Sequence, residues 1–404
     1  MKVLSPLRRT AAAIEARTPA HRDRAIDGLR ALALLAVPTG HWLLGGFTRS
    51  ADGALHNASP LSAFGGLAPV SWVLQMLGIF FLVGGYASVL SFRRHQGSTR
   101  AWLGGRVARL GRPVLGVTAV WAALLPLLHH GFGVPSDTLR TASTLVVQPL
   151  WFVGVYVVVT ALTPYCVRAA RRLGAWAAAP LLGSVAVVDF LRYGPYAEAM
   201  PSWLGVLTIL PGWLFAYQLG VSWGEGRVGR RHAWGLLLGG AALFAALLVW
   251  CGYPASMVGV PGEARTNSHP PSLLVLALAA TQSGAAILLR ERLGRLLRRP
   301  ALWAPVVVVN LSAMTILCWH QTAMLAAAIP ASYAGEVAGL VGAPDSAAWI
   351  LARLAWLPVF AALLLLIGRY ARAFESPWTR AGTALRAAAG VLAAGFAVFA
   401  LGLA

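Results

Sequence analysis

The sequence predicts an all-α fold, namely a polytopic integral membrane bundle of about eleven transmembrane helices. The first supporting observation is composition. Hydrophobic residues make up 58% of the 404 residues, and charged residues only 11%, whereas roughly 25% are charged in soluble proteins. The second is that apolar runs of about 20 residues recur along the chain. The third is that arginines alternate between the connecting segments. These observations argue against a soluble enzyme.

The chain begins with a basic arm, 1–24, which we expect to be disordered or interfacial on the cytoplasmic side. It is not typical of a cleavable signal, because the apolar run after it opens with Asp27 and Arg30 and has no small-residue cleavage site. The apolar runs then follow in order at 26–47, 70–92, 112–131, 148–166, 176–192, 204–223, 233–251, 272–290, 302–329, 349–369 and 384–404. We therefore predict a transmembrane domain over 25–370, and a cytoplasmic loop and an extra C-terminal helix over 371–404.

The distribution of cations predicts the orientation of the spans. With the N-terminus in the cytoplasm, 28 of the 33 Lys and Arg residues fall in the arm and in alternate loops on that side. The opposite loops hold only Arg49, Arg140, Arg192 and Arg265. Because Lys- and Arg-rich loops stay cytoplasmic, we predict a multi-pass protein of the plasma membrane. The net charge of +20 then reflects topology and attraction to the lipid bilayer, not a nucleic-acid partner.

Three other features limit the possible chemistry. The outer loops are short, so catalytic groups must lie in the spans or at their edges. The cysteines, Cys166, Cys251 and Cys318, have no CxxC spacing and predict neither a disulfide framework nor a metal site. No internal repeat is visible, although repeats are typical of secondary transporters.

The first span carries the most informative ionisable residues. Arg30 and His41 are eleven residues apart, close to a whole number of helical turns, so both face one side of the helix. A rise of about 16.5 Å places Arg30 at the cytoplasmic edge and His41 near the midplane. Asp27 lies one turn before Arg30 on the same face. An ionisable group at the midplane indicates function, but His41 could instead hydrogen-bond a neighbouring helix, and Arg30 could be a topology anchor.

Later segments add further candidates, each with a structural alternative. Arg106 and Arg109 form a fork on one helix face that suits phosphates, or else they anchor the loop. Trp151 and Tyr156 in span four could bind substrate or simply pack. His320 in span nine could bind substrate or bond another helix. We expect Arg353 to snorkel to the interface, to contact an anion or sugar, or to pair with Asp345. Asp189 is expected to pair with Arg192.

In order, these segments resemble acyltransferase family 3. Asp27-Gly28-Leu29-Arg30 with His41 matches the family's Arg-x10-His start. Its Phe-Phe-x-x-Ser-Gly motif is matched by Phe80 to Gly85, with Gly84 where Ser is usual. Three further family motifs follow. The Arg-x-x-Arg with a nearby Pro is matched by Arg106, Arg109 and Pro113, and the Leu-Trp-Phe block by Leu150, Trp151 and Phe152. The late block of an aromatic residue and a histidine is matched by Trp319 and His320. The resemblance covers about 24–370. It implies a ten-span core, which makes 384–404 an appended helix. The fused domain and the span-four acidic pair of larger members are absent.

The resemblance implies transfer of an acyl group, often acetyl, from cytoplasmic acyl-CoA to a hydroxyl of a glycan, a glycolipid or a glycosylated small molecule. His41 would be the general base, since imidazole has a pKa of about 6.5. Asp27 would hold Arg30 or an arginine of the next loop. Arg30, Arg106 and Arg109 would bind the phosphates of CoA. Trp151, Tyr156 and His320 would contact the acceptor. No metal is expected. The acyl group, the acceptor, the donor to the oxyanion and the oligomeric state stay open.

Two rival functions share this composition. A transporter or flippase would have similar spans, but the acidic residues cluster at span edges, and only Asp189 could lie inside a span. A catalytically inactive relative could serve as a scaffold or receptor, but the intact Arg30 and His41 pair argues against this.

Overall fold

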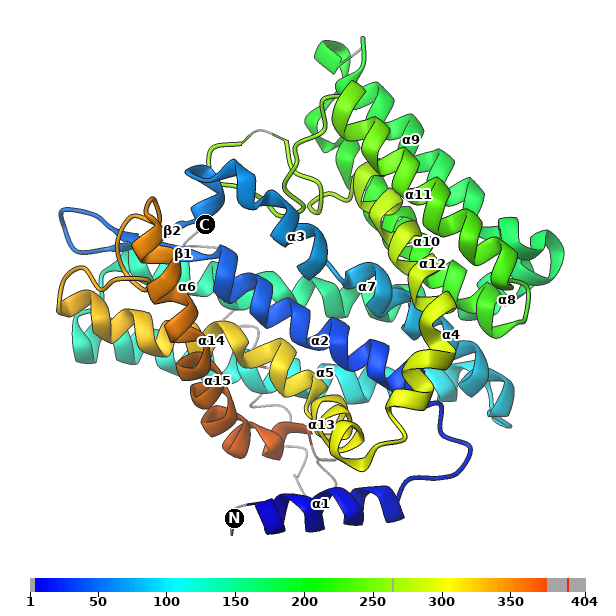
Figure 1. Ribbon diagram of the computed structural model, residues 1–404. Coiled ribbons are helices and arrows are strands. Elements are labelled where there is room, and N and C mark those ends of the chain that lie inside the picture. The colour runs from blue at the N-terminus through cyan, green and yellow to red at the C-terminus, as the bar shows by residue number, and fades with distance from the viewer. Residues whose placement is uncertain (1–3, 196, 264, 376–390, 392–404) are drawn as a thin grey trace. The chain divides into compact units, whose positions relative to one another are not determined.

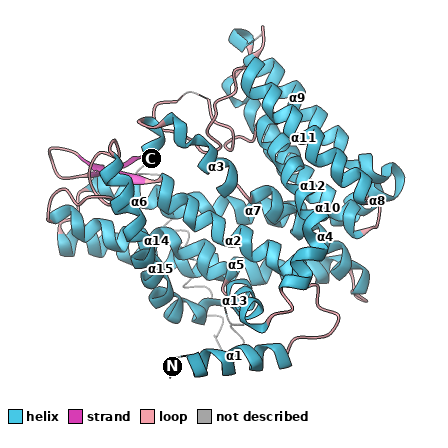
Figure 2. Ribbon diagram, in the orientation of Figure 1, coloured by secondary structure: helices cyan, strands magenta, loops and turns pink. Residues whose placement is uncertain are grey.

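The computed structural model describes residues 4–195, 197–263, 265–375 and 391. This part of the chain is almost entirely helical (Figures 1 and 2), which confirms the all-α class. Its one sheet is a hairpin in which β1 (Gly46–Arg49) pairs antiparallel with β2 (Leu55–Ala58). The α-helices are α1 (Leu4–Ala16), α2 (Arg24–Leu44), α3 (Ala68–Leu74), α4 (Leu77–Arg94), α5 (Thr99–Pro126), α6 (Ser136–Val147), α7 (Trp151–Ala161), α8 (Thr163–Leu173), α9 (Ala179–Tyr193), α10 (Ile209–Gly224), α11 (Arg230–Trp250), α12 (Leu273–Leu296), α13 (Pro300–Leu311), α14 (Ala313–Tyr333) and α15 (Ala347–Glu375).

The described residues contain fewer candidate membrane spans than the eleven predicted for the whole chain. Within the described residues, eight continuous helical stretches are long and apolar enough to cross a bilayer, and α13 with α14, bent by 75°, makes a ninth if counted as one span. These account for every predicted run from 70–92 to 349–369. The run at 26–47 forms α2 but is not among them, because Asp27, Arg30 and His41 make it less apolar. The run at 384–404 lies outside the described residues. The chain is a multi-pass membrane protein.

The chain divides into two compact units. The first, here unit 1, comprises Met1–Ala36, Ala68–Trp102 and Val155–Leu311; the second, unit 2, comprises Val37–Leu67, Leu103–Gly154 and Ser312–Ala404. Helix α2 contributes its first part to unit 1 and its last part to unit 2. Each unit has its own packing, and each holds some of the candidate residues.

Unit 1 is built on two helix pairs that approach closely at glycines. In the pair α4 and α10, a Cβ at Gly220 would lie 1.9 Å from the carbonyl oxygen of Leu82. In the pair α11 and α12, a Cβ at Gly284 would lie 2.5 Å from the carbonyl oxygen of Ala233. Small residues let helix backbones meet where lipid supplies no hydrophobic drive for association. These glycines fix the helices that carry the Phe80–Gly85 motif.

Unit 2 has an apolar core that includes Trp121, Met324 and Phe360, and its hairpin is tied to a neighbouring helix. The Leu55 amide on β2 donates to the Thr138 hydroxyl at 2.9 Å, and the Thr141 hydroxyl donates to the Leu55 carbonyl at 2.9 Å. Both threonines are on α6, so the segment that follows α2 is held in place.

The N-terminal arm contains helix α1, and residues 17–23 then lead to α2 without regular helix. Helix α1 ends near Glu15, which pairs with Arg24 at 2.6 Å. The guanidinium of Arg24 lies 5.1 Å from the ring centroid of Trp303 on α13, and the Trp303 indole donates to the Thr18 hydroxyl at 2.7 Å. The arm is therefore fixed to unit 1 by polar contacts.

The expected pairing of Asp189 with Arg192 is wrong. In the described part of the chain, no salt bridge joins them. Asp189 instead accepts hydrogen bonds from the Tyr253 hydroxyl at 2.9 Å and from the Leu273 amide at 2.7 Å. Burial raises the pKa of Tyr253, which lies in the loop after α11, and the nearby carboxylate raises it further. The phenol therefore stays protonated and donates to Asp189.

Candidate functional site

At the start of α2, Asp27 is the centre of a polar cluster in unit 1. Its carboxylate is buried and accepts from Arg22 at 2.5 and 2.9 Å and from Arg30 at 3.3 Å. Arg30 also donates to the side-chain oxygen of Asn310, whose amide nitrogen donates to the Asp27 carbonyl at 2.9 Å. The expected pair of Asp27 and Arg30 is thus present. The second cation is Arg22 of the arm, not an arginine of the loop after the second span.

The glycine of the Asp-Gly-Leu-Arg sequence has a packing role. A Cβ at Gly28 would lie 2.5 Å from the Leu297 side chain, just after α12. The contacted atom is the end of a flexible side chain, so a larger residue at position 28 would require Leu297 to move. Gly28 thus leaves room for the Leu297 side chain against α2.

In unit 2, His41 and His320 lie side by side. Their ring centroids are 5.1 Å apart with the planes inclined at 42°. His41 is half-buried in the last turn of α2, and Nδ1 of His41 is 3.2 Å from the amide nitrogen of Gln321. His320 and Gln321 on α14 are buried. The structure therefore brings together two of the predicted site residues and adds Gln321.

The backbone of α14 determines which nitrogen of His320 carries its proton. Nδ1 lies 3.0 Å from the carbonyl oxygens of both Ile316 and Leu317. Carbonyl oxygens only accept, so Nδ1 is the protonated nitrogen and Nε2 keeps its lone pair. The ring is fully buried, and Nε2 has no hydrogen-bond partner among the described residues. His320 therefore offers a buried acceptor for a hydroxyl proton.

Gln321 can act on His41 in two ways. Its amide nitrogen faces His41 Nδ1, and its oxygen, Oε1, has no hydrogen-bond partner among the described residues. An amide can present either its nitrogen or its oxygen to a neighbour. With the oxygen toward His41, Nδ1–H would donate and Nε2 would be left basic. Gln321 therefore lies where its orientation can favour either tautomer of His41.

Arg353 is a buried cation that holds the end of α2. It is 1% exposed and donates to the carbonyl oxygens of Trp42, Gly45 and Gly339. The first two carbonyls end the helix that carries His41, where a cation also complements the helix dipole. Snorkelling is therefore wrong. Contact with an anion or sugar is not what holds the residue, and no carboxylate in the described part of the chain pairs with it.

The remaining predicted residues are divided between the two units. Tyr156 is in unit 1, where its ring packs on Phe80 and Phe81 with centroids 5.5 and 6.1 Å away. It also fills the space over Gly84, where a Cβ would lie 2.8 Å from the ring. A serine at that position would collide with Tyr156. The departure from the family's usual Ser therefore has a packing reason.

Trp151, Arg106 and Arg109 belong to unit 2. Trp151 packs against Phe152 with centroids 6.1 Å apart. Arg106 is half-buried and Arg109 exposed, one turn apart on α5, as the fork spacing predicts.

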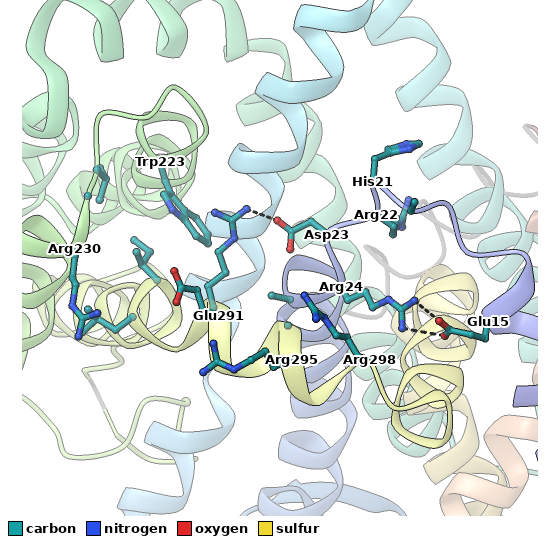
Figure 3. A pocket seen from close by; sticks show the side chains of 18 residues that line it. Glu15, His21, Arg22, Asp23, Arg24, Trp223, Arg230, Glu291, Arg295 and Arg298 are labelled. Atoms are coloured by element: carbon teal, nitrogen blue, oxygen red, sulfur yellow. Dashed lines mark hydrogen bonds and ion pairs between the residues drawn. The ribbon is translucent and has the colours of Figure 1, made fainter. Parts of the chain in front are cut away.

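Sequence reasoning missed two features. Gln321 follows His320 directly, so the Trp319-His320-Gln321 block was a usable signal. The second feature is a basic pocket in unit 1 with a volume of about 1170 Å³ (Figure 3). Its arginines come from segments assigned to one side of the membrane, but they were interpreted only as topology anchors. Within the described residues, no group of three or more His, Cys, Asp and Glu could hold a metal ion.

Comparison with known proteins identifies the family. A family model described as an acyltransferase domain matches residues 23–367, most of the chain and both polar clusters. No curated protein and no solved structure matches the chain. The matched region starts just before the Asp-Gly-Leu-Arg sequence and ends within α15. The chain belongs to acyltransferase family 3.

Proposed function

We propose that this membrane acyltransferase moves an acyl group, with acetyl as the expected case, from cytoplasmic acyl-CoA to a hydroxyl of a glycan, a glycolipid or a glycosylated small molecule. The plasma membrane is its proposed location. The observation that carries the proposal is the contact of His41 with His320 and Gln321 in a chain of this family. Two imidazoles beside a buried amide supply the proton acceptors that acyl transfer to a hydroxyl requires.

His41 is the proposed general base. With Gln321 presenting its oxygen to Nδ1–H, the basic Nε2 of His41 removes the acceptor's hydroxyl proton as that oxygen attacks the thioester carbonyl. The tetrahedral intermediate then collapses, the carbon–sulfur bond breaks, and the proton passes from His41 to the departing thiolate. The products are an ester and free CoA. A positioned base of this kind contributes about 10²- to 10⁴-fold to the rate.

His320 is the proposed acceptor-binding residue. Its Nε2 is buried and free to accept a hydrogen bond, while its Nδ1–H is held by two carbonyls of α14. A substrate hydroxyl would satisfy this nitrogen, and a substrate lacking the hydroxyl would leave it unpaired at a cost of about 1–3 kcal/mol. Trp151 and Tyr156 are proposed to supply apolar contact to the acceptor.

Arg30, Arg106 and Arg109 are proposed to bind the phosphates of the donor. Within the described residues, Arg30 uses Nε and Nη2 on Asn310 and Asp27, which leaves Nη1 available. Asp27 would act on the donor through Arg30, because its carboxylate fixes that guanidinium. Arg106 and Arg109 offer a fork that suits phosphate oxygens.

The test is acyl transfer by the purified full chain in lipid nanodiscs with radiolabelled acetyl-CoA and a panel of glycans and glycosylated macrocycles. We expect acceptor-dependent release of CoA by the wild type and a loss of about 10²-fold or more in His41→Ala. His130→Ala removes an exposed histidine and serves as the matched control. Unchanged transfer by His41→Ala would remove His41 from the mechanism. No transfer to any acceptor, with no binding of acetyl-CoA, would favour a transporter or flippase.

Gln321→Glu tests the tautomer argument separately. A carboxylate beside Nδ1 would hold the proton on His41, so we expect the acid limb of the pH–rate profile to move to higher pH. A role in packing alone would lower the rate at every pH and leave that limb in place.

A further inference from the structure

The basic pocket is the cavity of unit 1 that lies where the N-terminal arm meets the ends of α10 and α12 and the start of α11 (Figure 3). Its six arginines are Arg22, Arg24, Arg230, Arg290, Arg295 and Arg298. Three segments distant in sequence therefore supply its cations. Each of those segments was assigned to the cytoplasmic side from charge alone.

The carboxylates of the pocket neutralise only part of this charge. Glu15, Asp23 and Glu291 face the six arginines, which leaves a formal excess of three positive charges. Glu15 pairs with Arg24 at 2.6 Å, and Asp23 pairs with Arg290 at 2.5 Å. These pairs fix one wall of the pocket.

Arg22 is held by Asp27 at 2.5 Å. The other wall carries three arginines that have no partner in the described part of the chain. Within the described residues, neither Arg230 nor Arg295 nor Arg298 has an ion pair or a side-chain hydrogen bond, and Figure 3 draws no dashed line to any of them. They extend from the start of α11 and the end of α12. All three side chains are exposed, so their guanidinium groups are accessible to an anion.

The size and the donor type indicate the ligand. A volume of about 1170 Å³ exceeds the roughly 300–1,000 Å³ of most small-molecule pockets, so the space suits more than one inorganic ion. Guanidinium groups bind phosphate oxygens through paired hydrogen bonds. Three unpaired arginines beside a fixed wall therefore match a ligand with at least two phosphate charges.

We infer that the basic pocket binds the phosphate groups of a polyanionic ligand through Arg230, Arg295 and Arg298. In the cell this ligand is the nucleotide end of acyl-CoA, an identification that rests on the proposed function. An anionic phospholipid headgroup has the same phosphate chemistry and is the other source to be distinguished.

The first experiment titrates the full chain, in nanodiscs of phosphatidylcholine, with CoA and with pantetheine, which lacks the phosphates. We expect CoA to bind, pantetheine to bind far more weakly, and Arg295→Gln/Arg298→Gln to raise the Kd of CoA by roughly tenfold or more. The control Arg292→Gln/Arg299→Gln removes the same charge from exposed positions around the end of α12 that do not line the pocket. We expect it to change the Kd by less than about twofold. Equal unfolding temperatures of the two double variants would establish that both fold.

The second experiment separates the two phosphate sources. Phosphatidylglycerol is added to the nanodiscs, and retained lipid is counted by native mass spectrometry. One outcome is that the wild type retains phosphatidylglycerol, that the pocket variant does not, and that the lipid weakens CoA binding to the wild type. This would assign the pocket to phosphate groups, with lipid as a competing occupant. CoA and phosphatidylglycerol binding that both survive in the pocket variant would overturn the inference. Binding is read without turnover, so a failure of acyl transfer by the wild type, or unchanged transfer by His41→Ala, would refute the proposed function and leave this result standing.

Discussion

His320 has one nitrogen committed to the protein and one left for something else. Nδ1 is shared between two carbonyls of its own helix, and Nε2 is buried without a partner in the described part of the chain. A histidine placed only for packing would normally satisfy both nitrogens, because a buried unpaired polar atom is costly. This unsatisfied atom is the observation on which the proposed contact with an acceptor hydroxyl rests.

Replacing His320 should affect the acceptor more than the donor. His320→Phe keeps a ring and removes the nitrogen, so we expect the KM of the acceptor to rise about tenfold, the value of one lost hydrogen bond in a buried site. The KM of acetyl-CoA should stay the same. Steady-state kinetics with each substrate varied in turn would check this. An equal rise in both KM values would indicate that the site as a whole had been disturbed.

Arg353 should matter for stability as well as for rate. In Arg353→Met, the carbonyls of Trp42, Gly45 and Gly339 lose their donor, and each unsatisfied buried group costs about 1–3 kcal/mol. We expect the unfolding temperature in detergent to fall and acyl transfer to fall with it, because the end of α2 carries His41.

The control for this prediction is Arg140→Met, which removes an exposed arginine. We expect neither property to change in that variant. A stable and fully active Arg353→Met protein would contradict the capping role.

Among the elements, the α4 and α10 pair is the most sensitive to added volume. Gly220→Ala would place a Cβ where the Leu82 carbonyl lies, so the two backbones must separate. We expect a loss of about 1–3 kcal/mol in the free energy of unfolding. Gly235→Ala on α11 has open space around it and should leave stability nearly unchanged. Reversible unfolding in mixed micelles would measure both, and equal values would argue against a close-packed crossing.

Apolar runs located the helices well but not their interruptions. Nine of the eleven predicted runs correspond to candidate membrane spans, with the bent pair counted as one, because hydrophobic length alone sets a span. The bend between α13 and α14 was not predicted, since Asn310 and Ser312 are ordinary polar residues in a long apolar run. Helix α2 is less apolar than its neighbours because it carries ionisable residues, and the same residues made it the most informative span in the sequence.

The candidate site was predictable in part. The spacing of Asp27, Arg30 and His41 predicted that these residues share one helix face, and the predicted pair of Asp27 and Arg30 is present. Contacts between distant segments could not be predicted, because nothing in the sequence places Gln321 beside His41 or three arginine-rich segments around one cavity. Such contacts depend on packing between helices and not on local pattern.

For the whole molecule, the native cysteines offer a test of orientation. Cys251 is exposed at the end of α11, whereas Cys166 and Cys318 are buried. With the N-terminus in the cytoplasm, Cys251 faces outward. We therefore expect a membrane-impermeant maleimide to label intact cells at this residue and to fail in Cys251→Ser. Adding Arg227→Cys to that variant should restore labelling only after the membrane is permeabilised. The reverse pattern would invert the predicted topology.

The contact of Tyr156 with Gly84 has a consequence for the family's history. The ring occupies the space that a larger residue at position 84 would need, so the two positions are not free to change independently. A chain with Ser at position 84 would need a smaller side chain at position 156 or a tyrosine turned away from α4. Related chains should therefore show these two positions drifting together, and a tyrosine ring opposite a serine should be rare among them.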